Sequence, residues 1–220
     1  FDFRADHRVF LHPGFLLSGL LHRWFGLSLQ ASFLALWKPV AVLLTFFGCR
    51  QYVRRLVPGR AAAHGALFCA LFVVMPWSAI FKWIGSGPQR MYTFDFISGE
   101  LWTGQMQLGY MMTAVAVCTM PLVLLGVERF REGAVGGGAP GGLGVLAASA
   151  VGAALVMWLQ PWQGAELLII ICGVEAWRRW RQGIGLDWRV IAVLVAGAAP
   201  AVYYAWLGGN DASWRLASHA

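Results

Sequence analysis

The sequence predicts an all-α integral membrane protein with about six transmembrane helices and an N-terminal amphipathic helix in the membrane interface. Apolar stretches of about 20 residues, the length that crosses a bilayer, alternate with short breaks that are rich in arginine or end in tryptophan. Hydrophobic residues are 59% of the chain, charged residues are 12%, and the mean hydropathy is +0.62. Because the basic residues cluster in the breaks, the net charge of +7 indicates membrane topology, and we expect no nucleic-acid partner.

Residues 1–28 are expected to form an outer loop followed by the interfacial helix. Pro13 suits the first turn of a helix, and the leucines of LHPGFLLSGLLHRWFGLS share one helical face. Such a helix, apolar on one side only, is typical of the membrane interface. The chain opens with Phe1 and has no secretory signal segment, so we expect it to be a piece of a longer protein.

Residues 29–207 are expected to form a bundle of six spans, and the whole chain 1–220 a single transmembrane domain. The spans are predicted at about 29–48, 61–84, 107–127, 143–159, 165–177 and 190–207. A kink is expected at Lys38-Pro39, and GAVGGGAPGG is expected to be a flexible linker. Pro161 and Gly164 in QPWQG predict a tight antiparallel hairpin, in which Gln160 and Gln163 cap helix ends or line an outer vestibule.

The arginines predict the orientation. If residues 50–60 are cytoplasmic, alternation of six spans puts 128–142 and 178–189 on the same side, and these breaks hold ten of the seventeen basic residues. Both ends of the chain then lie outside the cytoplasm.

The acidic residues on the outer side are the candidates for chemistry. Asp2 and Asp6 precede the interfacial helix, where a carboxylate can take a proton from a hydroxyl or bind a metal; a solvated loop is the alternative. Asp95 and Glu100 lie in an aromatic loop and are candidates for binding. Lys38 is the one basic residue deep in a span, so it meets a lipid phosphate, or it snorkels, or it pairs with an acidic residue on another span. The four cysteines stand singly and indicate small buried side chains, and no metal site is predicted.

The order of these elements resembles the GT-C class of membrane glycosyltransferases and its bacterial relatives. The resemblance is carried by FDFRADHRVFLHPGFLLSGLLHRWFGLSL before a span, by RQYVRR after it, and by the later QPWQGAELLIIICGVEAW and AVYYAWLGGNDASWR. It implies a protein of the bacterial cytoplasmic membrane that transfers a sugar from a polyprenyl-phosphate donor on the non-cytoplasmic side. A departure is that the first span and the start of its loop, which usually carry the acidic residue of the class, are not seen in this sequence.

Carried onto this sequence, the resemblance makes Asp2 or Asp6 the catalytic base. The substrate-binding candidates, basic ones for the lipid phosphate among them, are His12, Lys38, Lys82, Arg90, Asp95, Glu100, Gln160 and Gln163. The partners implied are membrane lipid and the lipid-linked sugar donor, and no cofactor is expected apart from a possible divalent metal. The alternative is a non-enzymatic polytopic protein, either a transporter or an assembly subunit.

Overall fold

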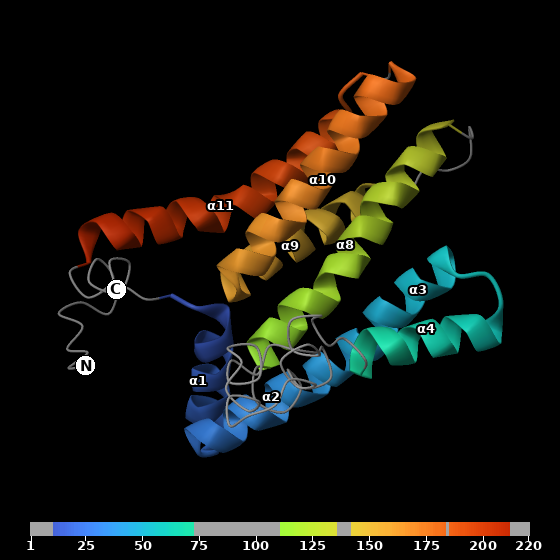
Figure 1. Ribbon diagram of the computed structural model, residues 1–220. Helices are drawn as coiled ribbons and strands as arrows, with labels where there is room; N and C mark the ends of the chain where they lie inside the picture. The colour runs from blue at the N-terminus through green and yellow to red at the C-terminus, as the bar shows by residue number, and fades with distance from the viewer. Residues whose placement is uncertain (1–10, 73–110, 136–141, 184, 212–220) are drawn as a thin grey trace, which may run out of the picture.

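The computed structural model (Figure 1) describes residues 11–72, 111–135, 142–183 and 185–211. Within these ranges every regular element is a helix and no strand occurs. The linker 136–141, the second half of the second predicted span, the loop after it and the first residues of the third predicted span lie outside the described residues.

The first helix, α1 (Pro13–Phe25), is present, and Pro13 lies in its first turn as predicted. It ends where Gly26 adopts a left-handed conformation with φ 65°, which glycine takes without steric cost. Trp37 of the next helix donates from Nε1 to Gly14 O at 3.0 Å and to Ser18 Oγ at 3.2 Å. The protein-facing side of α1 therefore consists of small residues, and its large apolar side chains point away, with Trp24 69% exposed.

The second helical stretch is longer than predicted. Helix α2 (Leu29–Leu44) continues through the π-turn η1 (Thr45–Cys49) into α3 (Arg50–Leu56), so 28 residues run without a break. The arginine-rich break predicted after residue 48 is therefore not a break in the helix, which continues through RQYVRR. Arginine is a good helix former and its long stem can lie along apolar surface. The helix ends only before Pro58 and Gly59, and Gly59 has φ 94°.

The third break is also more helical than expected. Helix α4 (Arg60–Phe72) follows the turn at Gly59, and α8 (Met111–Val135) covers the described part of the third predicted span. We predicted that this span ends at Val127, but α8 continues through the charged ERFRE segment to Val135. Loss of the apolar pattern ends the membrane-spanning part of a helix, but the charged residues that follow can extend the same helix into water.

The last three helices are α9 (Leu143–Leu159), α10 (Pro161–Gln182) and α11 (Trp188–Asn210). The bounds predicted for α9 are confirmed, and α10 extends beyond the predicted 165–177 at both ends. The turn at QPWQG is confirmed, because Gln160 is extended and separates α9 from α10. Gly164 allows the two helices to touch, since a Cβ built there would lie 2.4 Å from Met157 Cα.

Three of the described helical stretches are long and apolar enough to cross a bilayer: Leu29–Leu56, Met111–Arg129 and Trp188–Asn210. Helix α9 is apolar but shorter. Helices α8, α9 and α10 run side by side, and α1 lies at one end of the bundle beside the start of α2 (Figure 1). The core lies where α8 and α9 meet, with Val115 and Val156 fully buried. This arrangement has two distinct ends, one at the start of α1 and one at the end of α8.

Candidate functional site

The end of the bundle at which α1 begins is built around the backbone of Leu11. Leu11 N donates to Tyr203 Oη at 2.7 Å, and Trp158 Nε1 donates to Leu11 O at 2.8 Å. Tyr204 Oη donates to Trp158 O at 2.5 Å. Side chains of α9 and α11 thus satisfy both backbone polar groups of Leu11. We call these four residues the α1 clamp, because they tie the start of α1 to the ends of α9 and α11.

His12 strengthens the same junction and is buried. Its Nδ1 accepts a hydrogen bond from Gly14 N, which caps α1, and its Nε2 lies 3.3 Å from Leu159 O. Since Nδ1 accepts, the neutral ring carries its proton on Nε2 and donates it to the carbonyl. Burial lowers the pKa of His12, and the hydrogen bond to Leu159 partly offsets this. His12, predicted as a substrate-binding residue, is thus engaged in structural contacts.

Gln160 and Gln163 lie at the adjacent α9–α10 turn. Gln160 is the boundary residue of both helices, and its side chain makes no capping hydrogen bond. The side-chain oxygen of Gln163 is buried and has no hydrogen-bond partner among the described residues. A buried amide oxygen without a donor is costly, so this position suits a donor group supplied by a ligand or water.

Lys38 lies apart from these residues. It is exposed on α2, where it lines an open apolar groove of about 450 Å³ with Leu34, Pro39 and Val42. It lies nine residues from Leu29, about 14 Å along the helix. Among the described residues no hydrogen bond or ion pair joins it to His12, Gln160 or Gln163, so the structure does not bring these candidates together.

The remaining candidate residues lie outside the described part of the chain. They are Asp2, Asp6, Lys82, Arg90, Asp95 and Glu100.

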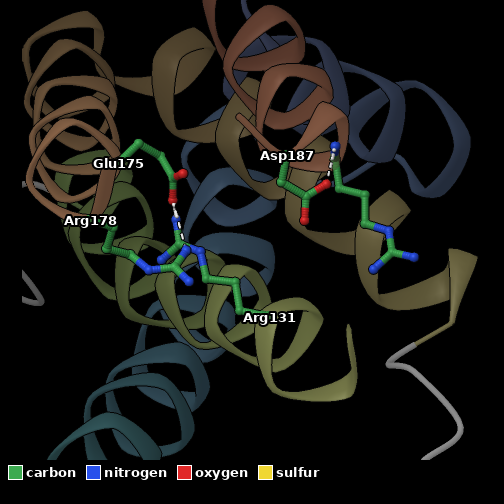
Figure 2. A network of polar contacts seen from close by, with 5 residues as sticks. Arg131, Glu175, Arg178 and Asp187 are labelled. Carbon is green, nitrogen blue, oxygen red and sulfur yellow. Dashed lines mark hydrogen bonds and ion pairs between the residues drawn. The ribbon is translucent and has the colours of Figure 1, made fainter. Parts of the chain in front are cut away.

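The opposite end of the bundle carries a buried ion-pair network (Figure 2). Glu175 of α10 pairs with Arg131 of α8 and, at 3.4 Å, with Arg178. The Glu175 side chain is only 9% exposed and that of Arg131 15%. Burial, with a smaller contribution from Arg178, lowers the pKa of Arg131 to about 10, so the guanidinium stays charged at neutral pH. Sequence reasoning did not single out Glu175; its spacing of three residues from Arg178 was the available signal.

Two further contacts belong to this arginine-rich end. Arg55 of α3 pairs with Glu128 of α8 at 3.1 Å, with both side chains almost half exposed. Asp187 caps α11 by accepting from Arg189 N at 2.9 Å. Arginine-rich segments that are far apart in the sequence thus meet at one end of the helices. The orientation predicted from the arginines requires this. The side of the membrane on which this end lies remains a prediction.

The cysteines differ partly from expectation. Cys118 is buried and Cys49 is partly buried, with the two sulfur atoms 3.8 Å apart, but Cys69 and Cys172 are exposed. Among the described residues no three His, Cys, Asp or Glu side chains gather as a metal site would require.

The chain matches no protein-family model, no curated protein and no solved structure.

Proposed function

We propose that this chain belongs to a GT-C-like glycosyltransferase, or a relative of one, with six spans and a site on the non-cytoplasmic side. The resemblance to that class implies the chemistry, and the α1 clamp supports a site beside the start of α1. The donor is a sugar linked to polyprenyl phosphate, and the acceptor presents a hydroxyl group.

The observation that carries the proposal is that the clamp holds the start of α1 against the α9–α10 turn. Asp6 is five residues from Leu11, and five residues span at most about 18 Å. We propose that Gln163, whose buried side-chain oxygen has no donor among the described residues, belongs to the same site. An interfacial helix at this place lets a lipid-linked donor enter sideways from the leaflet while a polar acceptor arrives from water.

In the proposed reaction, Asp2 or Asp6 takes the proton of the acceptor hydroxyl. The acceptor oxygen forms a bond to the anomeric carbon, the bond from that carbon to the phosphate oxygen breaks, and polyprenyl phosphate leaves with the electron pair. The base must lie within about 3 Å of the hydroxyl, or reach it through one water. Asp95 and Glu100 are proposed to bind the acceptor, and Lys82 and Arg90 the phosphate.

The pattern of buried hydroxyls favours this site over a transport pathway through the bundle. A transporter is expected to direct polar side chains from several spans into one cavity at mid-membrane. Thr119 donates to Val115 O within α8, and Thr45 donates to Ala41 O while its Oγ1 lies 3.1 Å from Cys118 Sγ. These buried hydroxyls of the described spans are hydrogen-bonded to other protein groups.

The test is sugar transfer from a polyprenyl-phosphate donor by the full chain in membranes. Asp6→Asn and Asp95→Asn are expected to reduce transfer, because asparagine keeps the shape of the side chain but removes the base or the charge. Asp187→Asn is the matched control, since asparagine also caps helices and Asp187 lies at the opposite end. Full activity of both Asp6→Asn and Asp95→Asn would remove these residues from the mechanism.

A further inference from the structure

The arginine-rich end contains a cavity that is lined by more positive than negative side chains. It has a volume of about 340 Å³ and lies between α3 and α8. Its charged lining residues are Arg54, Arg55, Arg129 and Glu128, and Gln51 and Leu125 complete the lining. Glu128 pairs with Arg55, so Arg54 and Arg129 face the cavity without an ion-pair partner among the described residues. The cavity therefore favours an anion.

A second cavity of about 320 Å³ continues from the first between α8 and α9, and Gln51, Leu125 and Arg129 line both. Its lining is mainly apolar and extends along α8 from Arg129 to Thr119. Ten residues of helix rise about 15 Å, which is half of a hydrocarbon core of about 30 Å. The second cavity thus has the depth of one leaflet.

Small residues shape this apolar slot. On one side of it the two helices touch, because a Cβ built at Gly126 would lie 2.0 Å from Ser149 Oγ and one at Gly152 would lie 2.8 Å from Val123 Cγ2. Gly144 and Ala148, which also line it, are exposed, and a Cβ at Gly144 would meet nothing within 4 Å. The slot is therefore closed where the helices touch and open to the surroundings at Gly144 and Ala148.

We propose that these joined cavities bind an anionic phospholipid of the surrounding leaflet. Its phosphate lies between Arg54 and Arg129, and one acyl chain lies in the slot between α8 and α9. The joining of a cationic pocket to an apolar slot one leaflet deep matches an amphiphile with an anionic head group, whereas a soluble phosphate would use only the first cavity. This site lies at the end opposite the α1 clamp and does not depend on the proposed sugar transfer.

The experiment measures binding of tail-labelled phosphatidylglycerol and phosphatidylcholine to the purified full chain after removal of native lipid. Phosphatidylglycerol is expected to bind more tightly than phosphatidylcholine, and the preference is expected to shrink as salt is added. Arg54→Gln and Arg129→Gln are each expected to weaken binding of phosphatidylglycerol about fivefold, the effect of one basic side chain at a membrane surface. Gly144→Leu adds a bulky side chain to the lining of the slot and is expected to weaken binding of both lipids.

Matched controls come from the neighbouring helix α10. Arg179→Gln removes an exposed arginine from the same end without touching either cavity, and Gly173→Leu enlarges a glycine that likewise meets nothing within 4 Å. Both controls are expected to bind lipid as the parent does.

Three results would overturn the proposal. The first is equal binding of the two lipids, or an equal loss in Arg179→Gln and Arg129→Gln. The second is displacement of the lipid by soluble glycerol phosphate at lipid-like concentrations, which would make the site one for free phosphate. The third is a Gly144→Leu variant that unfolds more easily but binds lipid normally, which would mean that another part of the protein fills the slot.

Discussion

Gly164→Ala tests the contact that holds the α9–α10 hairpin together. The added methyl would lie 2.4 Å from Met157 Cα and 2.7 Å from its Cβ, so one helix must move. Overpacking of this kind costs about 1–3 kcal/mol. The same change also favours the helix by up to about 1 kcal/mol, because alanine is a better helix former than glycine.

Gly173→Ala separates these two effects. Gly173 lies on the same helix and a Cβ there meets nothing within 4 Å, so this variant gains the helix preference without the clash. The difference between the two variants is therefore the steric cost of about 1–3 kcal/mol. At about 2–4 °C per kcal/mol for a chain of this size, Gly164→Ala is expected to melt about 2–12 °C below Gly173→Ala.

The assay is thermal unfolding of both purified variants in the same detergent. Met157→Ala in the Gly164→Ala background is expected to restore little, because the nearest atom is the backbone Cα, which the truncation leaves in place. Equal melting temperatures for Gly164→Ala and Gly173→Ala would refute the close approach of the two helices.

Three further predictions concern charge and orientation. Glu175→Gln leaves Arg131 buried without its partner and is expected to lower the free energy of unfolding by about 3–5 kcal/mol, whereas Glu128→Gln at the exposed pair is expected to cost less than about 1 kcal/mol; similar losses would contradict the buried network. Because burial lowers the pKa of His12, its neutral form stabilises the folded state above about pH 6.5, and the melting temperature is expected to drop as the pH falls below that value. His12→Asn keeps a capping side chain and is expected to remove that part of the pH dependence, so an unchanged pH profile would exclude His12 as its source. A cysteine at Gly59, in a variant without native cysteines, is expected to resist an impermeant thiol reagent in intact cells, and labelling there would reverse the orientation.

The helices that the sequence predicted well are those whose ends carry a local signal. Pro13 and Gly26 bound α1, and Gln160 and Pro161 separate α9 from α10, because proline and glycine act through their own backbone geometry. The prediction is wrong at RQYVRR, where the charged residues indicate the end of an apolar segment but not the end of the helix. Arginines alter where a helix meets water, but they do not end it.

The sequence by itself determined that the chain is helical and apolar, and it located the arginine-rich breaks. Only the tertiary structure decided which side chains from distant breaks meet: Glu175 with Arg131, Arg55 with Glu128, and Trp158 with Leu11. The physical reason is that hydropathy and helix signals act over a few neighbouring residues. A pairing between helices depends on their packing, which close contacts such as that of Gly164 with Met157 allow.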